Sequence, residues 1–282
     1  MNSKFLNLIL SIGFVPVLVI FFASCKKDPG TNGNTSNPVI SYKPPVIVPT
    51  TPVSYTLVWA DEFNGTAVDP ASWNMETGSL GVNNEKEYYQ ASNAAVVNGN
   101  LVITAKKETV GGMPYTSARL NTMGKITAQY GRIEARIKLP LGAGLWPAFW
   151  MLGANITTVS WPNCGELDIM EHVNADNLIY GTMHWNSGGG HAQYGLNTTT
   201  TPDDYHVYAI EWDANSIKWY VDNTLFVTGN LQNNINNTGA FQLPFFIILN
   251  LAVAGDFPGQ TVDDNKIPAS MYVDYVRVYK AK

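Results

Sequence analysis

The sequence predicts an all-β domain built as a sandwich of two sheets, and three observations carry this prediction. Apolar and polar residues alternate with the period of two that strands require, and this pattern recurs through residues 54–282. Turns rich in glycine and asparagine separate the alternating segments at short intervals. No segment has the 3.6-residue apolar spacing of an amphipathic helix. Many short strands joined by such turns are typical of a two-sheet sandwich.

The first 53 residues are expected to lie outside this domain. A short basic start precedes an apolar run at residues 5–22, and Ala23-Ser24-Cys25 then places small residues before a cysteine. This order is typical of a bacterial lipoprotein signal, so we expect residues 1–24 to be a signal peptide and Cys25 to carry lipid. An uncleaved membrane anchor is the alternative. Residues 25–53 are rich in Lys, Pro, Gly, Thr, Asn and Ser, which indicates a flexible linker and an extracytoplasmic, lipid-anchored protein.

Composition narrows the possible partners. The formal net charge is −5, which offers no basic field for nucleic acid. Aromatic residues make up 12% of the chain, and their flat faces suit the apolar faces of sugar rings. Cys164 is the only cysteine besides Cys25, so no disulfide is expected. A nucleophilic role for Cys164 is the alternative to a buried free thiol. We expect a monomer.

Individual strands follow from the alternation. Residues 101–105 place Leu, Ile and Ala on one face, and residues 217–221 do the same with Ile, Trp and Val. Residues 132–139 alternate four charged with four apolar side chains, which indicates a half-buried strand. Residues 245–253 are almost entirely apolar, which suits a central strand covered on both faces. Turns are expected at residues 98–100, 111–112, 142–144 and 222–223.

Three carboxylates lie within six residues, at Glu166, Asp168 and Glu171, in an otherwise apolar strand. Such a cluster is costly to bury because desolvation and mutual repulsion both oppose ionisation. On a regular strand Glu166 and Asp168 share a face, whereas Glu171 points to the opposite face. A β-bulge near Ile169-Met170 would return Glu171 to the shared face.

With all three acids on one face, two glutamates could flank a glycosidic bond with Asp168 between them. Carboxyl groups roughly 5–5.5 Å apart are typical of retaining glycosidases, and about 6.5–9.5 Å of inverting ones. A middle carboxyl can share a proton with a neighbour and so decide which glutamate stays ionised. A solvated edge strand and a cation site are the alternatives.

The segments around these acids resemble glycoside hydrolase family 16, in particular bacterial laminarinases, which are endo-1,3-β-glucanases. The resemblance extends through nearly the whole domain. It is carried by WADEFNG at 59–65, NNE at 83–85 with YY at 88–89, YTSAR at 115–119, YGRIEAR at 130–136, LWPAFW at 145–150, WP at 161–162, CGE at 164–166 and DYVRVY at 274–279.

The resemblance implies a β-jelly-roll sandwich of the concanavalin A-like kind, with a concave substrate cleft. It also implies that Glu166 is the nucleophile, Glu171 the acid/base and Asp168 a helper in a retaining double displacement that needs no cofactor. The residues implied to contact substrate are Asn84, Arg119, Trp146, Trp150, Trp161 and His184. Core packing for the tryptophans and His184, and an ion pair with a structural acid for Arg119, are the alternatives. His172 follows Glu171 directly and is expected to face away from the site.

The resemblance further implies one structural Ca²⁺, held by Glu62, the carbonyl of Gly99, and Asp274, although Asp274 could equally be an ordinary outward carboxylate. One position departs from the family pattern, because Phe257 stands where many laminarinases have tryptophan. The function expected is endo-hydrolysis of β-1,3 links in laminarin-like glucans. The alternatives are a relative acting on mixed-linkage β-1,3-1,4-glucan or an algal galactan, a non-catalytic glucan-binding surface protein, and an interaction module without a role on sugars.

Overall fold

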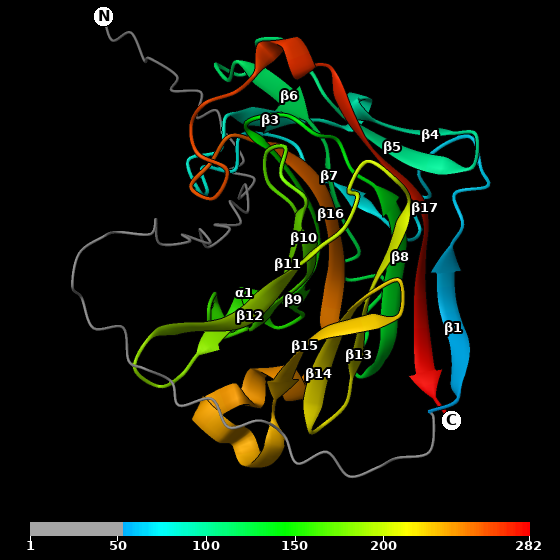
Figure 1. The fold of residues 1–282 in the computed structure, drawn as a ribbon, viewed down its shortest axis with the longest axis vertical. Coiled ribbons are helices and arrows are strands. Elements are labelled where there is room, and N and C mark those ends of the chain that lie inside the picture. Colours follow the sequence, from blue (N-terminus) through cyan, green and yellow to red (C-terminus); the bar gives the residue numbers. More distant parts are fainter. Residues whose placement is uncertain (1–52) are drawn as a thin grey trace, which may run out of the picture.

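The structure is a computed structural model and describes residues 53–282 (Figure 1). The expected signal peptide, Cys25 and nearly all of the expected linker lie outside the described residues. Residues 53–282 form seventeen β-strands, one short helix α1 (Ile156–Val159) and three 3-10 segments. Among these residues, no helix has the length and apolar character needed to cross a membrane.

Fifteen of the strands divide between two antiparallel sheets that stack as layers (Figure 1). The eight-stranded sheet has the order β15-β14-β13-β8-β17-β5-β4, and β1 also pairs with β17. Its strands are β1 (Tyr55–Asp61), β4 (Ala94–Val97), β5 (Asn100–Ala105), β8 (Gly131–Lys138), β13 (His206–Trp212), β14 (Ser216–Val221), β15 (Thr224–Asn230) and β17 (Ala269–Ala281).

The seven-stranded sheet has the order β12-β11-β10-β9-β16-β7-β2 and carries the candidate site. Its strands are β2 (Asn74–Met75), β7 (Arg119–Asn121), β9 (Leu145–Gly153), β10 (Glu166–Glu171), β11 (Leu178–Asn186), β12 (His191–Thr199) and β16 (Phe245–Val253). Two further segments, β3 (Glu87–Tyr89) and β6 (Tyr115–Ser117), form a small parallel pair. Because β10 has β11 and β12 on one side and β9 and β16 on the other, the acidic segment lies inside its sheet rather than at an edge.

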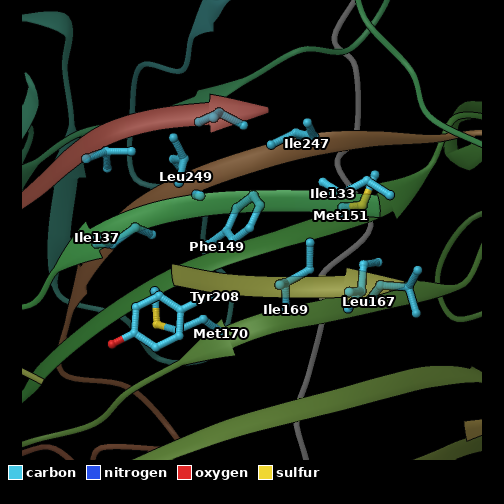
Figure 2. Close-up of a cluster of buried hydrophobic side chains, with 14 of the residues drawn as sticks. Ile133, Ile137, Phe149, Met151, Leu167, Ile169, Met170, Tyr208, Ile247 and Leu249 are labelled. Atoms are coloured by element: carbon cyan, nitrogen blue, oxygen red, sulfur yellow. The ribbon is translucent and has the colours of Figure 1, made fainter. Parts of the chain in front are cut away.

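The core lies between the two sheets, where the inward side chains interdigitate (Figure 2). Ile133 and Ile137 of β8 are fully buried there, as the alternation at residues 132–139 predicts. Every residue of β16 is buried, and β16 pairs with β9 on one side and β7 on the other. The expected central strand at residues 245–253 is therefore confirmed. The two-sheet antiparallel sandwich confirms the predicted all-β fold.

The turn between β14 and β15 shows how locally encoded these connections are. Val221 pairs with Thr224, which leaves a two-residue loop. Asp222 and Asn223 both adopt positive φ, 48° and 66°. This is the geometry of a type I′ turn, which aspartate and asparagine tolerate better than most residues and which matches the twist of a hairpin.

Candidate active site

Strand β10 contains the β-bulge that the spacing of its acids predicts. On the β9 side, Asp168 faces Trp150 and Met170 faces Phe149, so two steps along β10 correspond to one along β9. On the β11 side the register also shifts between Asp168 and Glu171. One residue is therefore absorbed at Ile169-Met170, and the three acids share one face of the sheet.

Both residues of the bulge belong to the core, where Figure 2 shows them among the buried side chains between the sheets. Ile169 is 1% exposed and Met170 is fully buried. The backbone at the bulge is held from the opposite sheet, because Trp219 Nε1 on β14 donates to the carbonyl of Asp168 at 2.8 Å. Gly181 on β11 makes room for this indole, since a Cβ there would lie 2.6 Å from Trp219 Cδ1.

Each glutamate is held by one indole N–H. Trp161 Nε1 donates to Glu166 Oε2 at 2.9 Å, and Trp146 Nε1 donates to Glu171 Oε1 at 3.0 Å. Glu166 is 1% exposed and Glu171 is 4% exposed. An indole N–H can only donate, so each bond fixes one carboxylate oxygen as an acceptor and orients the other. The two tryptophans therefore position the carboxyl groups, and Trp146 also lines a pocket at the site.

A pair of histidines lies beside Asp168. His184 on β11 places Nε2 3.0 Å from Asp168 Oδ2 and 3.9 Å from Glu166 Oε1. Its Nδ1 lies 2.9 Å from Nε2 of His191 on β12, and the two rings stack with 15° between their planes. The ring of His191 in turn lies 4.6 Å from that of Trp161. Asp168 and Glu166 are thus linked through three aromatic side chains.

The carboxylates open onto two adjoining pockets. The narrow pocket has a volume of about 50 Å³, and the wide pocket about 510 Å³. The narrow pocket is lined by Glu76, Leu80, Val82, Asn83, Glu85, Arg119, Trp146, Ala148, Trp150, Leu152, Ile156, Glu166, Asp168, Glu171 and Asn250. The wide pocket is lined by Glu171, Tyr180, Thr182, His184, Gln193, Gly195, Leu196, Asn197, Asp256 and Phe257. Glu171 lines both pockets, whereas Glu166 and Asp168 line only the narrow one.

Most of the residues expected to contact substrate are brought together here. Arg119 lines the narrow pocket, its Nε lies 3.1 Å from Glu76 Oε1, and its guanidinium lies 4.8 Å from the centre of the Trp150 ring. The expected alternative, an ion pair with a structural acid, is thus present in the same residue that borders the pocket. Trp150 is 8% exposed and donates through Nε1 to Asn250 Oδ1 at 2.8 Å. It therefore packs as a core residue on one side and faces the pocket on the other.

Asn84 lies further out than the other expected contacts. Its side chain is exposed, and Nδ2 donates to Asp256 Oδ1 at 2.6 Å. Its neighbours Asn83 and Glu85 line the narrow pocket instead. The loop that carries these residues has positive φ at both asparagines, 50° and 54°, which directs successive side chains to different sides.

Two residues next to the acids take structural positions. Cys164 is fully buried, and burial followed by the charge of Glu166 raises the pKa of its thiol to about 12. A thiol in this state is a poor nucleophile, which agrees with the prediction of a buried free thiol. His172 is also fully buried and lies 3.0 Å from the carbonyl of Asp176, and burial lowers its pKa. His172 lines neither pocket, as its position after Glu171 predicts.

Two groups of residues are relevant to metal binding. Glu166, Asp168 and His184 offer ligand atoms within 4.8 Å of one another, so the cation-site alternative has a geometric basis. At the expected calcium site, both oxygens of Glu62 accept hydrogen bonds from Arg277, at 2.7 and 2.9 Å. Asp274 Oδ2 accepts one from Arg136 at 2.7 Å. Each carboxylate is therefore paired with an arginine in this structure, and the calcium site stays a prediction.

Sequence reasoning missed several side chains at this site. His191 follows three glycines on a mostly exposed strand, and nothing in its local sequence marks it. Tyr180 was also missed, and it forms an aromatic wall of the wide pocket with Phe257, the position singled out from the sequence, with ring centres 5.0 Å apart. Asn250 interrupts the apolar run of β16 and was a signal that could have been used, because a single amide in a fully buried strand needs polar partners.

Comparisons with known proteins identify the family that shares this sequence and fold. The glycosyl hydrolases family 16 model matches residues 82–277. The catalytic domain of an endo-1,3-β-glucanase (laminarinase) from Thermotoga petrophila RKU-1 is similar in structure, with a TM-score of 0.74 and 44% identity over 82% of this chain and 99% of that one. A β-glucanase of Rhodothermus marinus is 41% identical over 244 residues, 80% of this chain and 85% of that protein.

The clotting factor G alpha subunit of Tachypleus tridentatus is 43% identical over 233 residues, which cover 80% of this chain. The match spans only about a third of that longer protein, 34% of its length. The family model covers more than half of the chain. This chain belongs to glycosyl hydrolase family 16.

Proposed function

We propose that the protein is a retaining, endo-acting glycoside hydrolase that cleaves β-1,3-glucosidic bonds in laminarin-like β-glucans. The observation that carries this proposal is the bulge at Ile169-Met170, which places Glu166 and Glu171 on one face with an indole N–H on each. A bulge disrupts the regular hydrogen-bond ladder of a sheet. Here it brings together two carboxyl groups whose burial is itself unfavourable. The laminarinase and β-glucanase relatives support the same reaction and polymer.

In the first step, Glu166 acts as the nucleophile. Trp161 holds Oε2 as an acceptor, so Oε1 is the oxygen that attacks the anomeric carbon. As this bond forms, the bond from the anomeric carbon to the leaving oxygen breaks. Glu171 gives its proton to that oxygen, and because Trp146 donates to Oε1, the proton belongs on Oε2. The products are a free glucan end and a glycosyl ester of Glu166.

In the second step, the Glu171 carboxylate accepts a proton from water while the water oxygen bonds to the anomeric carbon. The ester bond to Glu166 breaks, and both glutamates return to their starting states. Asp168 lies between them and contacts His184, so it can adjust the charge next to Glu166 as the ester forms and breaks.

The pockets indicate on which side the leaving glucan lies. Glu171 borders the wide pocket and Glu166 does not. The proton donor must face the leaving oxygen, so the leaving chain lies in the wide pocket, against Tyr180 and Phe257. The volume of about 510 Å³ gives this side room for a polymer rather than a single small group.

The test is to incubate the protein with laminarin, mixed-linkage glucan and agarose and to count reducing ends. Laminarin should be cleaved fastest, and Glu166→Gln should lose activity by several orders of magnitude because the nucleophile is gone. Faster cleavage of mixed-linkage glucan or agarose would move the proposal to the corresponding alternative. Binding of laminarin with no new ends from the unaltered protein would favour the non-catalytic glucan-binding alternative.

Stereochemistry tests the mechanism separately. Proton NMR of the first product formed should show the β-anomer, because two inversions at one carbon retain its configuration. An α-anomer as the first product would mean that Glu166 activates water instead of attacking the sugar.

We further propose that Cys25 anchors the protein by lipid on an extracytoplasmic membrane face. The support is the small-residue sequence before Cys25, after an apolar run. Cys25→Ala should release the protein from the membrane fraction or block its processing, as seen by fractionation and blotting. A monomer and a structural Ca²⁺ at Glu62, Gly99 and Asp274 are also proposals. The first is tested by light scattering and the second by the chelator experiment described below.

A further inference from the structure

Glu87 is a buried carboxyl that the proposed reaction does not use. Its side chain is 2% exposed, and its Oε2 accepts a hydrogen bond from the backbone N–H of Val253 at 2.6 Å. Its carboxyl is also hydrogen-bonded to that of Glu85. Burial raises the pKa of Glu87 well above its ordinary value, and the charge of Glu85 and the hydrogen bond between the two carboxyls raise it further. Two carboxyls can be hydrogen-bonded to each other only when a proton lies between them.

Glu85 is the end of a chain of hydrogen bonds that runs to the wall of the narrow pocket. Trp150 Nε1 donates to Asn250 Oδ1 at 2.8 Å, and Asn250 Nδ2 donates to Tyr89 Oη at 3.3 Å. Tyr89 then donates to Glu85 Oε2 at 3.2 Å. All three bonds point the same way, so the chain needs an acceptor at its end.

The other oxygen of Glu85 serves the loop beside the pocket. Asn83 Nδ2 donates to Glu85 Oε1 at 2.9 Å, and the carbonyl of Asn83 accepts the backbone N–H of Asp256 at 2.8 Å. Asn83 and Glu85 line the narrow pocket, and Asp256 lines the wide one. Glu85 therefore accepts one hydrogen bond from Tyr89 and one from Asn83. Since both of its oxygens act as acceptors, Glu87 is the carboxyl that carries the shared proton.

We propose that Glu87 is a positioning residue: it holds the proton that lets Glu85 end this hydrogen-bond chain, and so fixes the wall of the narrow pocket. The consequence for catalysis rests on the proposed glucanase function, whereas the position of the proton does not. Loss of the proton would place two negative charges in contact beneath the pocket, with no water to solvate Glu87. The wall would then shift, and substrate binding would weaken.

The other titratable and charged groups nearby do not offset the repulsion between Glu85 and a deprotonated Glu87. Tyr89 is buried, and burial followed by the charge of Glu85 raises its pKa well above the ordinary value, so it stays neutral. Arg119 pairs with Glu76, and Lys86 extends its Nζ to the carbonyl of Gln260 at the surface. Glu85 is thus the group that decides the state of Glu87.

The sign of the pH dependence follows from the direction of the shift. A carboxyl whose pKa is raised on folding contributes its full stability below its unfolded pKa, about 4.3 for glutamate, and loses it as pH rises through the folded value. Glu87→Gln keeps a donor for Glu85 and does not titrate. The melting temperature of Glu87→Gln minus that of the unaltered protein should therefore increase as pH rises above about 4.3.

The proton itself is tested by infrared spectroscopy of the full chain at neutral pH. A carbonyl stretch of a protonated carboxyl should be present in the unaltered protein and lost in the difference spectrum with Glu87→Gln. Glu108→Gln, an exposed carboxylate whose Oε1 accepts from Thr116, is the matched control and should leave that band unchanged. An identical band in Glu87→Gln and the unaltered protein would overturn the proposal, whatever the activity.

Positioning is tested by KM for laminarin across pH. The KM of the unaltered protein and of Glu108→Gln should rise several-fold on the alkaline side, while that of Glu87→Gln should change less and kcat should stay similar. Parallel KM profiles for all three would overturn the positioning role. If laminarin is not cleaved at all, the glucanase proposal fails, and the infrared band still shows whether Glu87 is protonated. If Glu87→Gln does not fold, the protonated band of the unaltered protein, followed through its own pH titration, must persist well above the ordinary glutamate pKa of about 4.3.

Discussion

Nε2 of His184 lies 3.0 Å from Oδ2 of Asp168, in a region where both side chains are almost fully buried. On the other side of the same ring, Nδ1 lies 2.9 Å from Nε2 of His191. Two assignments of protons fit these contacts: a neutral His184 with its proton on Nε2, facing Asp168, whose Nδ1 accepts from His191, and a His184 imidazolium that donates from Nδ1 to His191. In the neutral form, His191 selects the tautomer of His184 whose N–H faces Asp168.

His191→Phe should therefore lower kcat by about tenfold, the effect of losing roughly 1.4 kcal/mol of hydrogen bonding in the transition state. Phenylalanine keeps an aromatic ring against Trp161 and removes the donor, so KM should change little. Initial rates on laminarin measure this. His206→Gln, on β13 and outside both pockets, is the control and should keep full activity. Equal kcat in both variants and the unaltered protein would contradict the tautomer assignment.

The bulge makes Met170 a sensitive core position. Met170→Ala should lower the free energy of unfolding by about 2–5 kcal/mol, because a fully buried side chain leaves a cavity, whereas Met170→Leu should cost under about 1.5 kcal/mol. Urea denaturation measures both. Activity should follow the same order, since Met170 lies next to Glu171. Two variants of equal stability would show that the site can collapse around the cavity.

The thiol of Cys164 should be unreactive in the folded protein. Its pKa of about 12 leaves almost no thiolate at pH 8, and the side chain is fully buried. In a Cys25→Ala chain, a disulfide reagent such as Ellman's should detect one thiol after denaturation and none before it. Rapid labelling of the folded chain, accompanied by loss of activity, would revive the nucleophilic alternative for Cys164.

A chelator separates the two metal alternatives. Hydrolysis by two glutamates needs no metal, so EDTA should leave the rate on laminarin unchanged, whereas a catalytic cation at Glu166, Asp168 and His184 would be lost with the activity. A structural calcium predicts instead that EDTA lowers the melting temperature at fixed pH, and that Asp274→Asn removes this difference. An unchanged melting temperature would exclude the calcium proposal and leave Glu62 and Asp274 as partners of Arg277 and Arg136.

Several of the strands were predictable because each is encoded within a few residues. Alternation at residues 132–139 places Ile133 and Ile137 in the core, and the uninterrupted apolar run of β16 places it between two neighbours. The bulge was predictable for a related reason. A spacing of five between Glu166 and Glu171 conflicts with the period of two unless one residue is absorbed.

What the sequence by itself determined was therefore the all-β fold class, several of its strands, the parity of β10 and the three acids of the site. The tertiary structure decided which distant groups meet them: His191 beside His184, Trp219 at the Asp168 carbonyl, and Glu87 against Glu85 and Val253. These contacts depend on sheet order and on the direction of loops between strands, which arise from packing of the whole domain. Local patterns record which face a side chain takes, and only the folded chain determines what lies opposite that face.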